Sequence, residues 1–321
     1  MLIYSVAEIR THLHIIDLNM RALSSLKFID AIVRAGSIRR GAAAISITPS
    51  ALNRQLLAVE AELGVQIFER LPRGVRLNAA GEILIQHIRS QMSDFERVKS
   101  QIADLSGVRR GKVSIACSQA LLPFFLPEQI NHYQNQHPTV EFCVLPRDRS
   151  AAENALSDFS ADLALVFEPF DLRDIEPIIA VSQNLRAVMS SHHPLASKKT
   201  IRLRDCIKYP LALPTKPYGV RWLLDLALSK LSQPASIGLE SDSFEFLRMA
   251  IGETQMITFQ IDVGLPLKEV MGLPVSRPIA PSDLTNGMLL LCHLRGRVLS
   301  VAAAKFATQL EQALSERYDI D

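Results

Sequence analysis

The sequence predicts an α/β protein with three parts: a small helical domain with a two-stranded wing, one long helix, and a larger α/β domain of two lobes. Two short helical segments at a small-residue turn, followed by an arginine-rich hairpin, predict the first part. A seven-residue apolar repeat predicts the long helix, and strands alternating with helices predict the two lobes. The expected parts are an N-terminal extension (1–17), the helical domain (18–77), the long helix (78–107) and the two-lobed domain (108–321). Within the last part, lobe one is expected at residues 111–178 and 280–321, and lobe two at residues 179–279.

The helical domain begins with apolar residues at helical spacing over residues 23–35. Gly36 is expected to end this helix, and Ser37 is a suitable N-cap for the next. That second helix, about residues 38–45, contains Ala42, Ala43 and Ala44, which are small enough to let a neighbouring helix approach closely.

A third helix is predicted to begin at Thr48 and Pro49, because threonine caps free amides and proline suits the first helical position. Its apolar residues step by four, three and four positions and are expected to face the core: Leu52, Leu56, Val59 and Leu63. The start of the helix carries Thr48, Pro49, Ser50, Asn53 and Arg54. Short polar groups and a guanidinium on the first turns are typical of a helix that reads DNA from the major groove.

Arginines flank this helix on both sides. Arg39 and Arg40 open the preceding helix, where a helix-turn-helix crosses the phosphate backbone. Arg70, Arg73 and Arg76 lie in a hairpin around the turn at residues 71–74, and arginines there are expected to grip phosphate. The set predicts a winged helix-turn-helix, although each piece alone is as typical of an ordinary core or a solvated surface.

This region resembles the N-terminal signature of LysR-type transcriptional regulators. The resemblance rests on Leu26-x-Phe28, Ala35-Gly36-Ser37, Ala42-Ala43-Ala44, Ser50-Ala51-Leu52-Asn53-Arg54-Gln55, Glu60-x-x-Leu63-Gly64, Phe68-x-Arg70 and Arg73-Gly74-Val75-Arg76-Leu77-Asn78-x-x-Gly81. It implies that Pro49, Ser50, Asn53 and Arg54 occupy recognition-helix positions. The chain departs from the family pattern at Arg39-Arg40-Gly41, at Pro49 and at Asn78, which bears on base preference rather than on DNA binding.

Two apolar series offset by three positions run along the long helix. One contains Gly81, Ile88, Phe95 and Ile102, and the other Leu84, Gln91, Val98 and Leu105. The expected dimer seam is Leu84, Ile88, Gln91, Phe95, Val98, Ile102 and Leu105, which implies a homodimer or homotetramer. The alternative is a long helix that packs on its own domain.

Charge is unevenly distributed along the chain. Residues 18–110 hold 14 lysines and arginines against 8 acidic residues, although the whole chain has a net charge of only +2. This places the positive excess on the proposed DNA-binding part. Neither a signal peptide nor a membrane span is expected. The four scattered cysteines show no metal or redox motif, and we expect neither a metal nor a cofactor.

The remaining sequence is similar to the periplasmic-binding-protein-like effector domain of the same family. Strands are expected at about residues 112–117, 140–145, 162–167, 176–181, 186–189, 211–213, 237–239, 256–259, 275–279 and 288–292, with helices at 118–136, from 150, at 218–231, at 243–251 and at 300–316. Ligands bind beyond the carboxyl ends of such strands. The residues there are Ser118, Gln119, Arg147, Arg149, Ser150, Phe167, Thr215, Ser241 and Ser243, and the arginines and helix starts favour a small anion.

These patterns together predict a ligand-responsive transcriptional regulator rather than an enzyme. Its expected partners are double-stranded promoter DNA, a small-molecule effector and a second copy of the chain, with RNA polymerase as a further candidate; its expected location is the cytoplasm, at the nucleoid. One alternative is a hydrolase using Ser118, His132 and Asp162, although no nucleophile-elbow, P-loop or dinucleotide motif accompanies them. A second alternative is a regulator that senses oxidants through cysteine. A third is a pure solute-binding protein, which would not need the first hundred residues.

Overall fold

The computed structural model describes residues 27–105, 111–167, 174–216 and 218–318. The predicted N-terminal extension and the first residues of the first helix lie outside these ranges. The chain divides into two compact units, residues 1–98 and 99–321. Each unit is described separately below.

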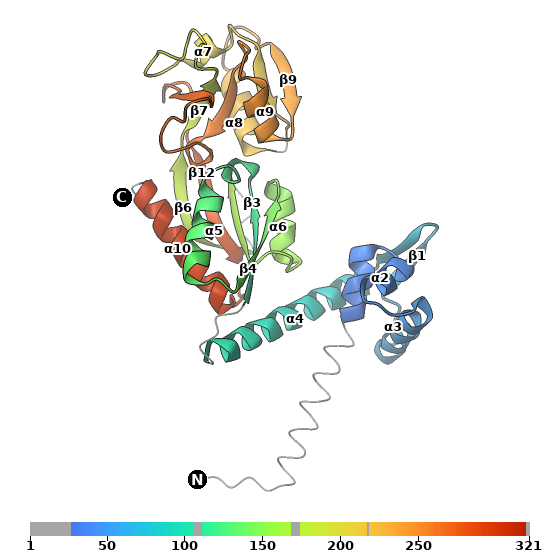
Figure 1. Cartoon of the computed structure of the whole chain (residues 1–321). Helices are drawn as coiled ribbons and strands as arrows, with labels where there is room; N and C mark the ends of the chain where they lie inside the picture. Colours follow the sequence, from blue (N-terminus) through green and yellow to red (C-terminus); the bar gives the residue numbers. More distant parts are fainter. Residues whose placement is uncertain (1–26, 106–110, 168–173, 217, 319–321) are drawn as a thin grey trace. The chain divides into compact units, whose positions relative to one another are not determined.

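The first unit has the predicted order of helices and wing (Figure 1). Residues 27–35 are helical, and Gly36 ends the helix with φ near +63°. The helices α2 (Ile38–Ala44) and α3 (Pro49–Leu63), the antiparallel hairpin β1 (Phe68–Leu71) and β2 (Gly74–Leu77), and the long α4 (Ala79–Leu105) follow. Ser37 occupies the N-cap of α2, but its side chain makes no capping bond.

The core of the first unit combines all three short helices with the start of α4. Its fully or almost fully buried apolar residues are Phe28, Ile29, Ile32, Ala42, Leu52, Leu56, Ile67, Phe68, Ile85 and Ile88. Two expectations are wrong in detail. Leu63 is exposed because the last turn of α3 extends past this core, and Ala43 and Ala44 are exposed as well. The close approach of α2 to the first helix occurs at Gly41, where a Cβ would lie 3.0 Å from the Ile32 Cα.

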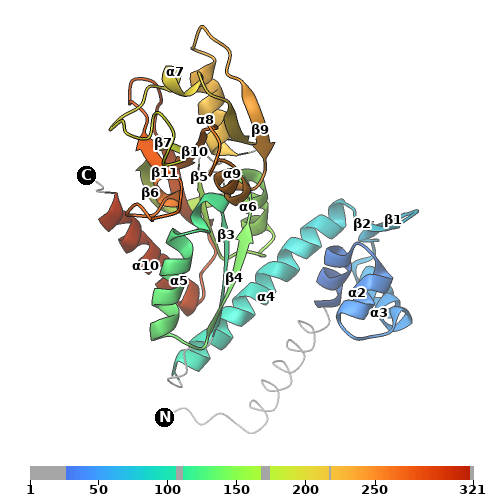
Figure 2. The ribbon, with the colours of Figure 1, turned by 45° about the horizontal axis from the view of Figure 1, so that its top comes forward.

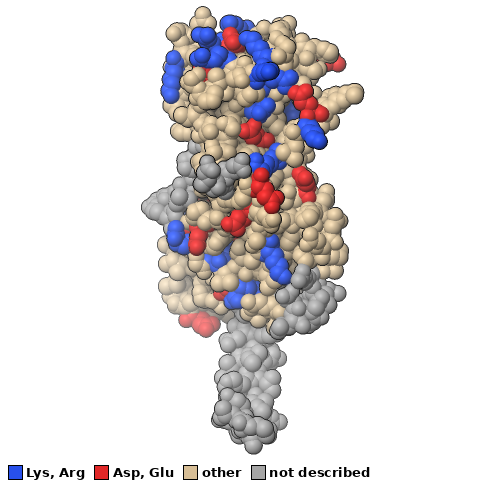
Figure 3. Space-filling model, turned by 90° about the vertical axis from the view of Figure 1, so that its left-hand side faces the viewer, with Lys and Arg blue, Asp and Glu red and all other residues tan. Residues whose placement is uncertain are grey.

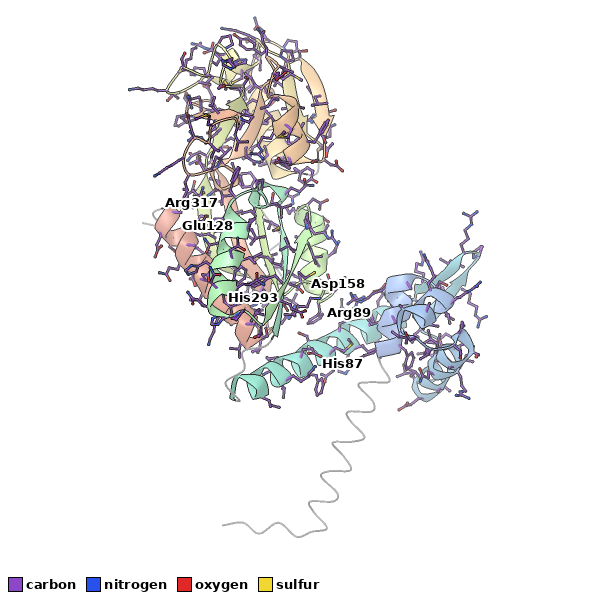
Figure 4. All side chains as sticks on the ribbon, viewed as in Figure 1. His87, Arg89, Glu128, Asp158, His293 and Arg317 are labelled. Carbon is purple, nitrogen blue, oxygen red and sulfur yellow. The ribbon has the colours of Figure 1, made fainter. Side chains whose placement is uncertain are left out.

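The first half of α4 belongs to the DNA-binding domain itself. Asp30, almost buried in the first helix, accepts a bond from Arg89 of α4 at 2.7 Å and one from Arg34 at 2.5 Å (Figure 4 labels Arg89). Ile88 is completely buried in the same core. The predicted dimer seam is therefore wrong at Ile88, because this side chain packs against its own chain and not against a second copy.

Lobe one of the second unit is a mixed five-stranded sheet in the order β4-β3-β5-β12-β6. Parallel β4 (Val140–Pro146), β3 (Gly111–Cys117) and β5 (Leu163–Phe167) lie beside the antiparallel pair β12 (Gly287–Leu294) and β6 (Ile175–Gln183). Helices α5 (Phe125–Gln136) and α10 (Val301–Arg317) cover one face, and α6 (Arg149–Ser157) covers the other (Figures 1 and 2). Alternate residues of β3 and β5 supply the two cores.

Lobe two contains the three-stranded sheet β10-β7-β11 and the parallel pair β8-β9. Its strands are β7 (Leu185–Met189), β8 (Leu211–Pro214), β9 (Ile237–Ser241), β10 (Thr258–Ile261) and β11 (Val275–Pro278), and its helices are α7 (Leu203–Cys206), α8 (Gly219–Leu228) and α9 (Phe244–Ala250). The predicted lobe boundary at residue 178 is wrong, because β6 pairs with β12 as far as Gln183 and stays in the first sheet.

The single helix expected at residues 118–136 is two elements. A short 3-10 helix, η1 (Gln119–Leu121), is followed by α5, with Pro123 between them. Pro123 has no backbone donor, and the next residue, Phe124, has non-helical dihedral angles (φ −133°, ψ −67°), so the two elements are separate. Within the described residues, no helix is both long enough and apolar enough to cross a membrane.

Lysines and arginines gather over lobe two on the face shown in Figure 3. Residues 185–279 contain 12 lysines and arginines against 8 acidic residues, whereas residues 111–184 and 280–321 together contain 8 against 15. The second unit is therefore acidic in lobe one and basic in lobe two.

Candidate nucleic-acid interface and effector pocket

The start of α3 is built as the sequence predicts. The Thr48 hydroxyl accepts a bond from the Ala51 amide at 3.2 Å, and Pro49 is the first helical residue. Thr48, Pro49, Ser50 and Arg54 are exposed, and Asn53 is half-buried. The opposite face of α3 is fixed in the core by Leu52 and Leu56, so the polar first turns point to the solvent.

Exposed arginines surround this helix start. Arg39, Arg40, Arg54, Arg70 and Arg73 are all exposed, and no carboxylate of the described residues pairs with them. Arg76 differs: it lies directly opposite Glu69 in the hairpin and bonds to its carboxylate at 2.8 Å. Arg76 therefore stays a predicted phosphate contact, but its charge is partly neutralised by Glu69 within the wing.

The wing is held against the turn between the first two helices. The Val75 amide donates to the Gly36 carbonyl at 3.1 Å, and a Cβ at Gly74 would lie 2.2 Å from the same oxygen. Gly74 also has φ of +137°, so no other residue fits there without strain. Asn78 then caps α4 by accepting from the Gly81 amide at 2.9 Å while donating to the Gln66 carbonyl at 2.8 Å.

A groove of about 320 Å³ separates α3 from the wing. Its polar lining is Asn53, Glu60, Gln66, Glu69, Arg70 and Asn78, and apolar side chains such as Leu56 and Leu57 form its floor. The Glu60 carboxylate is engaged by the Ile67 amide at 2.9 Å, which fixes the start of the wing. The groove joins the helix start to the hairpin, so both lie along one continuous surface.

The second unit contains a small pocket at the carboxyl ends of β3, β4 and β5. It is lined by Ser118, Arg147, Asp148, Arg149, Val166, Phe167, Tyr218, Gly219, Val220 and Phe244. The predicted residues Ser118, Arg147, Arg149 and Phe167 are thus brought together. Residues from both lobes contribute, and the free space of about 10 Å³ holds roughly one water molecule.

Several predicted effector contacts lie outside this lining. Ser150 is exposed on α6, and Thr215 offers its amide to the Ser241 carbonyl at 3.1 Å. The Ser243 hydroxyl caps α9 by accepting from Phe246, and the Ser241 hydroxyl accepts from the Ser243 amide. These serines serve local capping bonds, which is a common alternative role for serine at a helix start.

Sequence reasoning missed the lobe-two side of the pocket. Tyr218, Gly219 and Val220 begin α8, and Phe244 begins α9. Both helices follow strand ends, so the rule applied to Ser118 could have found them. Asp148 lies at one of the strand ends that the sequence indicated, but its role there was not predicted: it caps α6 by accepting from the Ala151 amide at 2.9 Å. A carboxylate of the chain itself therefore occupies the helix start that was expected to attract an anion.

The electrostatics of the pocket favour a protonated phenol. Burial raises the pKa of Tyr218, and the nearby carboxylates of Asp242 and Asp148 raise it further. The Tyr218 oxygen accepts a bond from the Gln119 amide at 3.0 Å, so its own proton is free to be donated. Gln119, which was predicted as an effector contact, does not line the pocket itself. It contacts the pocket residue Tyr218 through this hydrogen bond.

The cysteines are poorly suited to redox sensing. Burial raises the pKa of Cys117, Cys206 and Cys292 to about 12, so these thiols stay protonated at neutral pH. The thiolate is the reactive form of cysteine. Among the described residues Cys143 is the one cysteine that is only half-buried.

The hydrolase alternative conflicts with the geometry. Asp162 lies beside Ser114, at the opposite end of the strands from Ser118, which is about 13 Å at 3.3 Å per residue. Its carboxylate is bound by Arg297 at 2.5 Å and by the Ser114 amide at 2.8 Å. His132 contacts Gln136 on the exposed side of α5. The three residues are not brought together.

Comparisons with known proteins match both units. Residues 23–82 match the model described as "Bacterial regulatory helix-turn-helix protein, lysR family", and residues 106–315 match the "LysR substrate binding domain". The regulator YybE of Bacillus subtilis is 24% identical over 292 residues, covering 91% of this chain and 98% of that protein. GltC of B. subtilis, a transcriptional dual regulator, is 27% identical and covers 73% of this chain and 84% of that protein.

Solved structures show the same fold. Full-length OxyR from Pseudomonas aeruginosa, as a variant, superposes with a TM-score of 0.69 at 16% identity, covering 91% of this chain and 94% of that one. Full-length CbnR in complex with its target DNA gives 0.61 at 14% identity, covering 91% and 99%. With both domain models matched over most of its length, the chain belongs to the LysR family of DNA-binding transcriptional regulators and is not an enzyme.

Proposed function

We propose that this regulator binds promoter DNA through the first turns of α3 and the wing, and responds to a small anionic metabolite in the pocket of its second unit. The observation that carries the proposal is the ring of exposed arginines around a capped, outward-facing helix start. On the helix itself, Ser50, Asn53 and Arg54 would meet base edges and phosphates, with Thr48 and Pro49 fixing the helix start. Arg39, Arg40, Arg70 and Arg73 would contact phosphates on either side.

A second copy of the chain is part of the proposal. The later heptad positions of α4 are apolar and accessible: Val98 is 40% exposed and Ile102 is 59% exposed, and Phe95 is half-buried. Gln91, which precedes these three residues, is exposed. Leu84 is partly buried against the domain core. The side chain of Leu105 lies outside the described residues. We propose that the seam begins at about Gln91 and forms a homodimer, from which a homotetramer can be built.

The effector part of the proposal rests on the chemistry of the pocket. Arg147 and Arg149 bring positive charge, Ser118 and Tyr218 bring hydroxyl donors, and α8 starts at the pocket with Gly219 and Val220. Cationic and hydroxyl donors with free helix amides suit a small carboxylate. We expect the regulator to act on the nucleoid in the cytoplasm, with RNA polymerase as a downstream partner.

The first test concerns recognition by α3. Arg54→Ala is expected to weaken binding to an operator by about 1–3 kcal/mol if the guanidinium contacts a base. The binding curve is measured by fluorescence anisotropy with DNA from a site found by genome-wide mapping. Arg204→Ala, which removes an exposed arginine of lobe two, is the matched control and should leave the curve unchanged. An unchanged curve for Arg54→Ala would place Arg54 outside the interface.

The second test concerns the ion pair in the wing. Glu69→Gln removes the carboxylate that binds Arg76 and leaves the guanidinium available to a phosphate. DNA affinity should rise, and the slope of log K against log salt should steepen by roughly 0.9, as for one added phosphate contact. Glu62→Gln, an exposed change on α3 away from the groove, serves as the control. A slope that stays the same would show that Arg76 does not reach DNA.

The third test concerns the seam. Phe95→Asp is expected to split the dimer, because a carboxylate cannot be buried between two apolar helices without a partner. Sedimentation velocity at micromolar concentration measures the oligomeric state. Ile83→Asp is the control, since Ile83 is 75% exposed on α4 but lies outside both heptad series. Dimers that persist in Phe95→Asp would refute the seam.

The fourth test concerns the pocket. Ser118→Leu fills the space beside Arg147 and Phe167, so it should abolish the response of a target-promoter reporter to growth conditions. Operator binding by the purified protein should remain at wild-type strength. Ser150→Leu alters an exposed serine outside the lining and should keep the response. A reporter that still responds in Ser118→Leu would move the effector site elsewhere.

A further inference from the structure

Gln119 of lobe one joins the starts of two lobe-two helices. It is the first residue of η1, directly after Ser118. Its Nε2 donates to the Tyr218 hydroxyl oxygen at 3.0 Å, and its Oε1 accepts from the Phe244 amide at 3.4 Å. The Phe244 amide must meet an oxygen, which fixes the orientation of the carboxamide. One side chain therefore holds both α8 and α9 against lobe one.

The two residues bound by Gln119 also close the pocket. Tyr218 and Phe244 both line it, and their rings meet edge to face with centroids 5.2 Å apart. The free volume of about 10 Å³ is too small for any metabolite, because a single water nearly fills it. Movement of the Tyr218 ring to make room for a ligand breaks its hydroxyl bond to Gln119, and displacement of the start of α9 breaks the bond between the Phe244 backbone amide and Gln119.

A separate set of contacts holds the lobes together away from this lining. Gln183, which is fully buried, accepts from the Val263 amide at 2.9 Å. Arg317 at the end of α10 donates to the Leu265 carbonyl at 3.2 Å (Figure 4). None of these residues lines the pocket. Loss of the Gln119 bonds is therefore expected to loosen the helix starts while leaving the lobes connected.

Resting on the proposed effector function, we infer that Gln119 is an internal stand-in for the effector. The Gln119–Tyr218–Phe244 latch keeps the cleft closed without ligand. The effector binds by replacing the carboxamide with its own oxygen, which accepts from the Phe244 amide and contacts the Tyr218 hydroxyl. This chemistry selects a carboxylate or a carboxamide and rejects a cation. Such a latch sets the effector threshold, because binding must first break it.

The latch is testable without knowing the effector. In full-length Gln119→Ala, the peptides that cover residues 219–228 and 244–250 should exchange amide hydrogens faster, by about tenfold at Phe244 for the loss of its bond and the neighbouring one. Hydrogen exchange with mass spectrometry measures this. Gln134→Ala is the matched control: it removes a glutamine whose bond, to the Val140 carbonyl at 3.1 Å, stays within lobe one. Exchange that is equal in wild type and Gln119→Ala would overturn the latch.

Chemical rescue tests the ligand class. Gln119→Ala removes a CH2–CONH2 group and leaves a vacancy that matches acetamide, so millimolar acetamide or acetate should restore slow exchange in this variant and have little effect on wild type. The fluorescence of Trp222, the single tryptophan and a residue of α8, provides a second readout. Propylammonium has the same size but no acceptor and should not rescue. Equal rescue by propylammonium would show that filling space is sufficient, and the proposed replacement would be refuted.

These outcomes are independent of the effector proposal. A latch that opens in Gln119→Ala together with a reporter that ignores Ser118→Leu would keep the latch and reject the pocket as the sensing site. A reporter that loses its response in Ser118→Leu, together with unchanged hydrogen exchange in Gln119→Ala, would keep the pocket as the sensing site and reject the latch. Circular dichroism on each variant establishes that the fold is retained before either comparison is made.

Discussion

Burial of Ile85 and Ile88 in the core of the DNA-binding domain is the constraint on which the first unit depends. Each is at most 2% exposed, and full burial of such a side chain contributes about 1.5–3 kcal/mol. The Asp30–Arg89 ion pair lies beside this apolar contact and fixes the rotation of α4 about its axis. A rotation of α4 would remove the isoleucines from the core and break the pair, so the helix has one permitted orientation on the domain.

That orientation decides which later residues of α4 are accessible. The heptad series that buries Ile88 continues through Phe95 and Ile102, so the same helical face serves the domain core first and becomes accessible further along. In the proposed dimer, the orientation of each recognition helix follows directly from the pairing of the two α4 helices. α4 is one helix from Ala79 to Leu105, so the proposed seam and the residues packed in the domain core belong to the same helix.

The sequence predicted most of the helices and strands, although it merged η1 with α5 and did not indicate α7. It failed where packing partners decide which surface a residue contacts. Periodicity placed α3 and the strands β3, β4 and β5 within one or two residues, because each has a clear apolar pattern and a clear end. It could not show that Ile88 packs within its own chain, since the same heptad pattern serves a domain core and a dimer seam equally well. The lobe boundary was missed for a similar reason: β6 is one uninterrupted strand to Gln183, and only its pairing with β12 shows which sheet it belongs to.

The sequence also could not show which charged groups of the predicted sites already bind a partner within the chain. The sequence counts Arg76 among the cations and the start of α6 among the anion sites, yet Glu69 already binds Arg76 and Asp148 already caps α6. In both places a carboxylate of the chain takes the position expected for a ligand's anionic group, and the Gln119 carboxamide does the same at the pocket. An internal partner of this kind costs nothing in translational entropy, so an external ligand must offer better geometry or more charge to displace it. A backbone phosphate carries one negative charge, as Glu69 does, so it must compete for Arg76 through geometry and the other charges around it. At the pocket a carboxylate ligand carries a charge that the Gln119 amide lacks, so there the competition favours an anionic ligand over a neutral one.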